Sequence, residues 1–154
     1  GVVRFNNYAL APGMAGDRGT RTDVCAQCNY QIAPRNYVGF RAVLLTCATD
    51  RSWQHFCDQA AATGAMVGQV GARTHERIRG ELGGTRPSSG VLALAYYVQR
   101  YTSVAGCGFD NCNRGADHHY HDDKSPSPGC PHDGAKEAAW MASLEGQGKI
   151  VRLH

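Results

Sequence analysis

The sequence lacks any long apolar run, and no stretch approaches the ~20 apolar residues that a helix needs to cross a bilayer. The amino end also lacks the charged-then-apolar layout of a secretory signal peptide. Charge is scarce: charged residues make up 19% of the chain, and the formal net charge is +3. This balance is too mild to predict nucleic-acid binding but suits an anionic small-molecule substrate. As it stands, the sequence predicts a soluble domain.

Internal repeats and a linker-like boundary are also absent. A chain of 154 residues fits one domain and can bury a real core, so a single domain over residues 1–154 is expected. The sequence begins Gly1-Val2-Val3 with no initiator Met and enters a strand-like run at once. This start predicts that the domain is truncated.

Cysteine, in contrast, is abundant. Seven cysteines are many for this length, and they indicate either disulfides in an oxidising compartment or a metal site. Because the number is odd, at least one cysteine has no partner for a disulfide within the chain. The cysteines are Cys25, Cys28, Cys47, Cys57, Cys107, Cys112 and Cys130.

Hydrophobic patterning predicts strands alternating with helices, and therefore an α/β sheet covered on both faces. The expected strands are Val2–Phe5, Val38–Thr46, Ser103–Phe109 and Ile150–Leu153. The expected helices are Ser52–Ala62, Thr74–Leu82, Val91–Tyr101 and one that opens at Pro131 and runs through Leu144. Residues 110–131 form a long loop rich in Asp, His and Cys, and loops of that length in compact domains are usually functional or disordered.

A polar turn, Pro87-Ser88-Ser89-Gly90, leads straight into the apolar run that starts at Val91. Amides at the start of a helix lack intrahelical acceptors and lie at the positive end of its dipole, so they can hold an anion. Ser88 or Ser89 could equally be a helix N-cap. The turn by itself leaves both interpretations open.

Histidines gather downstream of this turn, in residues 117–122 and at His132. Histidine can take a proton from a hydroxyl near neutral pH, and a second histidine or a tyrosine can donate hydrogen bonds to a leaving phosphate. Glu137 follows His132 by five residues, which is about 500° of helix rotation. It is therefore predicted to secure local structure rather than to form a dyad with His132.

A zinc site is the rival interpretation, because cysteines and histidines alternate along this region and Cys25-x-x-Cys28 adds a further pair. No second C-x-x-C occurs, so the spacing fits a zinc template poorly. Besides Cys25 and Cys28, the candidate zinc ligands are Cys107, Cys112, Cys130, His118, His119, His121 and His132.

Several stretches together resemble the eukaryotic-type sialyltransferases and their sialyl motifs. Residues 2–7 and 17–22 resemble the second half of the large motif, and Pro87–Gly90 with the Gly108-Phe109 ending resembles the small motif. His119–Asp122 resembles the third motif, and His132 with Glu137 resembles the very small motif. They occur in the family's order. The resemblance extends from Val2 to Glu137.

This resemblance implies an enzyme that transfers sialic acid, or a related acidic sugar, from a CMP-sugar to a glycan hydroxyl, with inversion and without a metal or other cofactor. The implied fold is a GT-A-like variant of the nucleotide-binding, Rossmann-like α/β sheet, with its first strand and loop missing. His132 is implied as general base, and His119 as the donor of a hydrogen bond to the departing phosphate. The implied location is the Golgi lumen, as part of a type II membrane protein whose anchor is not in this chain.

The resemblance also implies a donor-binding set. Asn6 contacts the nucleotide, Ser88, Ser89 and Gly90 hold the donor's carboxylate or phosphate, and Tyr120 borders the same pocket. Together with the physical argument for the turn, these residues form the expected substrate site.

The chain departs from the family at three points. It starts after the Gly-Asn-Ser-type turn that binds the nucleotide, Tyr101 stands where the small motif carries a cysteine, and Arg18 replaces a small apolar residue. Two alternatives therefore stay open: an inactive sialyltransferase-like fragment, and a non-enzymatic binding domain stabilised by zinc or disulfides.

Overall fold

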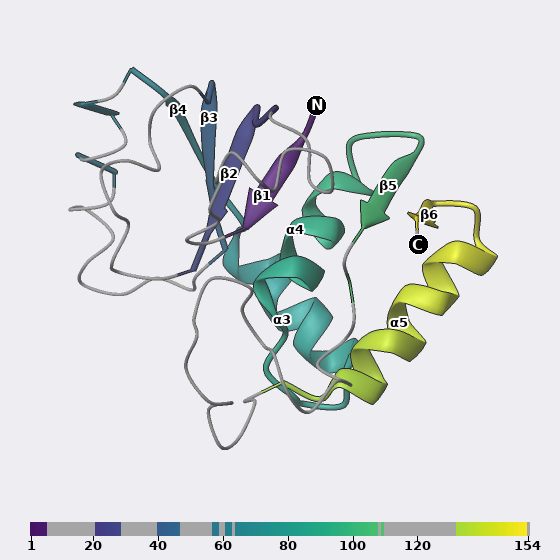
Figure 1. Cartoon of the computed structure of the whole chain (residues 1–154). Coiled ribbons are helices and arrows are strands. Elements are labelled where there is room, and N and C mark those ends of the chain that lie inside the picture. Colours follow the sequence, from purple (N-terminus) through teal and green to yellow (C-terminus); the bar gives the residue numbers. More distant parts are fainter. Residues whose placement is uncertain are drawn as a thin grey trace, which may run out of the picture. The chain divides into compact units, whose positions relative to one another are not determined.

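The computed structural model describes residues 1–5, 21–28, 40–46, 57–58, 61–62, 64–107, 109 and 132–153. It divides into two compact units, Gly1–Val70 and Gly71–His154, each of which is described by itself. The expectation of one domain over residues 1–154 stays a prediction. Figure 1 shows the strands and helices of both units.

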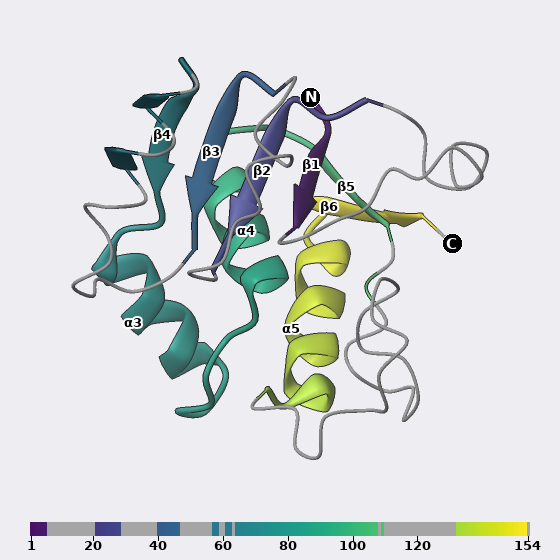
Figure 2. The same ribbon diagram turned by 60° about the vertical axis from the view of Figure 1, so that its left-hand side comes forward.

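The first unit is built on a four-stranded parallel sheet, seen side by side in Figure 2. Its strands are β1 (Val3–Phe5), β2 (Val24–Gln27), β3 (Ala42–Leu45) and β4 (Met66–Gln69), in that spatial order. Each strand is in parallel register with the next. A parallel sheet in a chain that also contains helices confirms the α/β class and is compatible with a Rossmann-like fold.

Burial follows the position of each strand in this sheet. In the inner strands β2 and β3, Cys25, Ala26, Val43, Leu44 and Leu45 are almost fully buried, as expected of the inner strands of a parallel sheet. The outer strand β4 exposes 71% of Met66. Burial raises the pKa of the Cys25 thiol to about 12.

Gln27 ends strand β2 with its side chain almost fully buried. Its backbone carbonyl accepts hydrogen bonds from the Thr46 amide (2.8 Å) and from Thr46 Oγ1 (3.1 Å). Within the part of the chain that the structure describes, neither the amide nitrogen nor the oxygen of its side chain makes a hydrogen bond of good geometry, although the amide lies near enough to the Cys25 thiol to oppose the rise of that thiol's pKa. Buried polar groups in that state lose their water without compensation, so Gln27 weakens the sheet's stability.

Gln27→Leu is therefore expected to raise the free energy of unfolding by about 1–2 kcal/mol, because it replaces an unsatisfied amide with an apolar group of similar size. Urea unfolding monitored by circular dichroism measures the change. Thr46→Val is the matched control: it removes the Oγ1 hydrogen bond and should lower stability by about 1 kcal/mol. A loss of stability in both variants would show that the Gln27 amide has a partner in solution.

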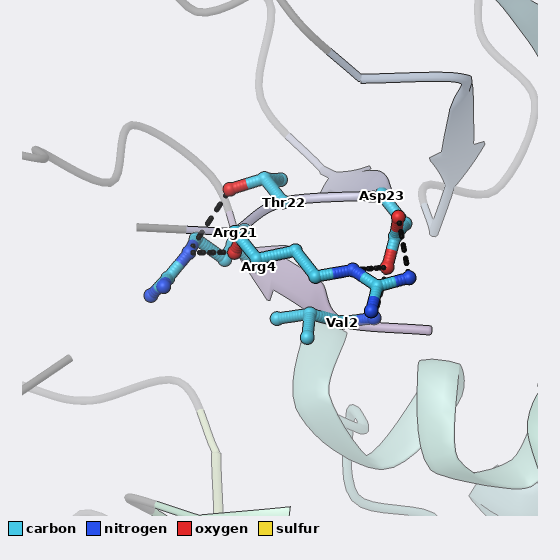
Figure 3. Close-up of polar contacts among 5 residues, drawn as sticks. All are labelled: Val2, Arg4, Arg21, Thr22 and Asp23. Carbon is cyan, nitrogen blue, oxygen red and sulfur yellow. Dashed lines mark hydrogen bonds and ion pairs between the residues drawn. The ribbon is translucent and has the colours of Figure 1, made fainter. Parts of the chain in front are cut away.

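Polar side chains tie β1 to the segment that leads into β2 (Figure 3). The Val2 amide donates to Asp23 Oδ2 at 2.7 Å, and Arg4 Nε donates to Thr22 Oγ1 at 3.0 Å and to the Arg21 carbonyl at 3.2 Å. The hydrogen bond from Val2, aided by the Arg21 guanidinium, lowers the pKa of the Asp23 carboxyl. These contacts fix the parallel pairing of β1 and β2.

The second unit contains α3 (Ala72–Glu81), α4 (Ser89–Tyr97), β5 (Val104–Cys107), α5 (Gly134–Gly146) and β6 (Ile150–Leu153). Strands β5 and β6 pair in parallel. The core joins α4, α5 and β6 through Leu94, Met141, Leu144 and Ile150. Among the described helices, none is both long and apolar enough to span a membrane.

Most of these elements match the sequence predictions within a few residues. β6 agrees fully with Ile150–Leu153, and α3 begins two residues before the predicted Thr74. α4 begins at Ser89 and ends at Tyr97, four residues before the expected end at Tyr101. Strands β2 and β4 were not predicted. Both are short and carry a glutamine at their last position, so neither shows a continuous apolar run.

Candidate active site

The turn before α4 is a helix N-cap, as one of the two interpretations predicts. Ser88 has extended backbone angles (φ −72°, ψ 162°), and its Oγ accepts a hydrogen bond from the Val91 amide at 3.3 Å. The cap leaves the amides of Ser89 and Gly90 at the helix start, and neither has an acceptor among the described residues. Capping and anion binding are therefore compatible at this turn.

A carboxylate of the chain itself already lies at this turn. Glu137 Oε1 accepts a hydrogen bond of 2.6 Å from the Ser88 amide, although the two residues are 49 positions apart. Glu137 is only 3% exposed. One of the backbone amides that the sequence assigns to a donor anion is thus occupied by Glu137, and this carboxylate holds the turn in place.

His132 lies beside the same turn. Its Nδ1 is 3.0 Å from the carbonyl oxygen of Arg86. In the tautomer that carries a proton on Nδ1, the ring donates to this carbonyl, and Nε2 keeps a lone pair that can accept a proton. This arrangement orients the imidazole in the way that a general base requires.

The start of α5 is joined to the turn by a third contact. Asp133 is the N-cap of α5 and accepts from the Lys136 amide at 3.1 Å, a bond that lowers the pKa of its carboxyl. Lys136 Nζ reaches Thr85 Oγ1 at 3.0 Å. Contacts from Lys136, His132 and Glu137 therefore fasten residues 85–88 to the first turn of α5.

Gly90 has a packing role of its own. A Cβ atom at this position would lie 2.6 Å from Cε1 of Phe109, and one at Gly106 would lie 3.2 Å from Cε2 of the same ring. The Phe109 ring thus fits between two positions that lack side chains. This contact explains a glycine in the first turn of α4 without any ligand.

Gly90→Ala is expected to lower the free energy of unfolding by about 1–2 kcal/mol, because overpacking against Phe109 outweighs the higher helix propensity of alanine. Urea unfolding of the single variant measures the loss. Adding Phe109→Leu to Gly90→Ala should recover part of it, since the smaller side chain relieves the overlap. Equal costs of Gly90→Ala in the two backgrounds would show that the ring does not restrict position 90.

Three predicted site residues, Asn6, His119 and Tyr120, lie outside the described residues. The structure links His132 to the Arg86 carbonyl and Glu137 to the Ser88 amide, and so connects the start of α5 to the segment that leads into Ser89 and Gly90. Sequence reasoning missed the contributions of Arg86 and Lys136. The run Pro131-His132-Asp133-Gly134 indicated a helix start, but a backbone carbonyl such as that of Arg86 leaves no signal in a sequence.

Most of the candidate zinc ligands also lie outside the described residues. In the described segments, no group of three or more Cys, His, Asp or Glu residues is placed to hold a metal ion. Cys25, Cys57 and Cys107 are free thiols there. Comparisons of the chain with protein-family models, with curated proteins and with solved structures found no match.

Proposed function

We propose that this chain is the catalytic domain of a glycosyltransferase that moves sialic acid, or a related acidic sugar, from a CMP-sugar donor to a glycan hydroxyl with inversion. The proposal includes a GT-A-like variant of the Rossmann-like fold and a location in the Golgi lumen. One observation supports it: His132 contacts the Arg86 carbonyl and Glu137 holds the Ser88 amide, so the imidazole is linked to the segment that leads into the Ser88–Gly90 turn. The order of the sialyl-like motifs supplies the substrate class.

In this proposal, Nε2 of His132 accepts the proton of the acceptor hydroxyl as the hydroxyl attacks the anomeric carbon. The amides of Ser89 and Gly90, with the positive end of the α4 dipole, bind the donor's carboxylate or phosphate. Departure of the phosphate builds negative charge on CMP and positive charge on the sugar. Fixed donors beside the phosphate therefore stabilise the transition state more than the ground state.

Glu137 acts in this proposal as a positioning residue. Its carboxylate holds the Ser88 amide and thereby fixes the turn that binds the donor. The remaining assignments concern residues outside the described segments: His119 donates to the leaving phosphate, Asn6 contacts the nucleotide and Tyr120 borders the pocket. No metal or other cofactor is assigned to the reaction.

The direct test is to incubate the purified chain with CMP-sialic acid and a panel of glycans that end in galactose or N-acetylgalactosamine. Mass spectrometry detects the sialylated product, and calorimetry measures CMP binding. CMP-Kdo in place of CMP-sialic acid tests whether another acidic sugar is the donor. The proposal predicts product with at least one donor.

Two outcomes would contradict it. Binding of CMP without any turnover would identify an inactive sialyltransferase-like domain. Absence of CMP binding together with stoichiometric zinc in the purified protein would instead identify a metal-stabilised binding domain.

A further inference from the structure

The second unit contains a groove between α3 and α5 that the proposed site does not use. Its volume is about 750 Å³, within the range of small-molecule sites. Lining residues come from the second half of α3 and the two residues after it, from one face of α5, and from Lys149 just before β6. Lys136, the first lining residue on α5, lies four residues after His132 along the chain.

A tryptophan held in a fixed orientation lies in the wall of this groove. Trp140 packs against the core of the second unit, and its Nε1 donates to Glu81 Oε2 at 2.6 Å. Arg77 occupies the other oxygen of the same carboxylate at 2.6 Å. The indole is therefore anchored on two sides before any ligand arrives, which reduces the entropy lost on binding.

The charge of the groove is positive. Arg77, Lys136 and Lys149 face a single lining carboxylate, that of Glu81, which Arg77 already neutralises. Lys136 pairs with Asp133 at 3.4 Å. The Lys149 ammonium is exposed and has no hydrogen bond or ion pair with another described residue. It is thus the charge in this groove that is most available to an anionic ligand.

From this combination we infer that the groove is the acceptor subsite and that it binds an oligosaccharide carrying an acidic group. The apolar face of a sugar ring stacks on an indole, while its hydroxyls hydrogen-bond to polar groups such as Gln147. Lys149 pairs with the acidic substituent. The inference rests on the proposed function and deepens it, because a transferase needs an acceptor site near its base, and Lys136 of the groove lies four residues after His132 along the chain.

The test uses the full chain labelled with ¹⁵N. The sequence contains two tryptophans, so its spectrum has two indole N–H signals, and Trp140→Phe identifies the one that belongs to Trp140. Lactose and a lactose carrying one sulfate are titrated separately, and CMP is titrated as a third ligand. We expect the sulfated sugar to shift the Trp140 signal and to bind more tightly than lactose.

Two charge reversals complete the test. Lys149→Glu should weaken binding of sulfated lactose by about fivefold or more and leave lactose binding unchanged. Arg73→Glu is the matched control, since Arg73 is an exposed residue of α3 that does not line the groove. This variant changes the net charge of the protein by the same amount as Lys149→Glu. Equal effects of the two reversals, or a Trp140 signal that responds to CMP and to neither sugar, would overturn the inference.

The titrations contain no donor, so their outcome is independent of transfer. Binding of the sulfated sugar by a chain that neither binds CMP nor transfers sialic acid would support the groove and contradict the proposed function. Transfer activity without any response of Trp140 to a sugar would support the proposed function and contradict the assignment of the groove as the acceptor subsite.

Discussion

His132→Ala is expected to reduce sugar transfer by about 10²–10⁴-fold while leaving the affinity for CMP unchanged. In the proposed mechanism the acceptor hydroxyl loses its proton as it attacks, and Nε2 of His132 is the group assigned to take it. The nucleotide does not depend on this imidazole, because its predicted contacts are the Ser88–Gly90 turn and Asn6. Initial rates of transfer and calorimetry of CMP binding measure the two quantities separately.

His132→Asn is the sharper variant, because the proposal gives the imidazole a catalytic role besides its contact with the Arg86 carbonyl. Its Nδ1 contacts the Arg86 carbonyl at 3.0 Å and so helps to fix the turn. An asparagine amide can still donate to that carbonyl but offers no basic nitrogen. Loss of transfer in His132→Asn, with unchanged stability, would assign the effect to the missing base. Retained turnover in both variants would refute the assignment of His132.

Arg86→Ala serves as the control, since the contact to His132 uses the backbone carbonyl of Arg86 and not its side chain. Transfer should survive this substitution to within a few-fold. A loss as large as that of His132→Ala would mean that the Arg86 guanidinium takes part in catalysis or donor binding.

Glu137→Ala is expected to lower the free energy of unfolding by about 1.5–3 kcal/mol, the range for a hydrogen bond to a charged group. The carboxylate is 3% exposed and accepts from the Ser88 amide at 2.6 Å, so its removal leaves that amide without its acceptor. Transfer should fall as well, because the turn that is proposed to bind the donor loses its link to α5. Urea unfolding and initial rates measure both effects.

Glu137→Gln separates the hydrogen bond from the charge. Glutamine keeps an oxygen that can accept from the Ser88 amide, so it should lose less than half of the stability lost by Glu137→Ala. A glutamine variant as unstable as the alanine variant would show that the negative charge at the start of α4, rather than the hydrogen bond, stabilises the turn.

Local patterns predicted the elements whose signals are short-range. The Ser88 cap, the helix start at His132 and Asp133, and strand β6 each follow from a few neighbouring residues. The α/β class followed from the alternation of apolar runs with helical spacing. Each of these features depends on interactions within about one helical turn or one strand, which is the distance over which a sequence pattern carries information.

The missed features depend on distant partners. Strand β2 forms because Cys25 and Ala26 are buried between two other strands, although its own four residues include a glutamine. The bond from the Ser88 amide to Glu137 joins positions 49 residues apart, whereas the local sequence indicates only that Glu137 secures nearby structure. Tertiary packing decides such contacts, and single-sequence patterns do not record it.

The burial of Cys25 makes the parallel sheet of the first unit sensitive to alkali and easy to monitor. The thiol of an unfolded chain ionises near its usual pKa of 9.0, whereas in the folded sheet it stays protonated up to about 12. Between these values the unfolded state binds fewer protons than the folded state, so the sheet loses stability as the pH rises.

Below that window, an alkylating reagent reaches Cys25 only when strand β2 opens. The labelling rate at this one sulfur therefore reports the opening of the sheet, while the exposed Cys107 reports the reactivity of the reagent.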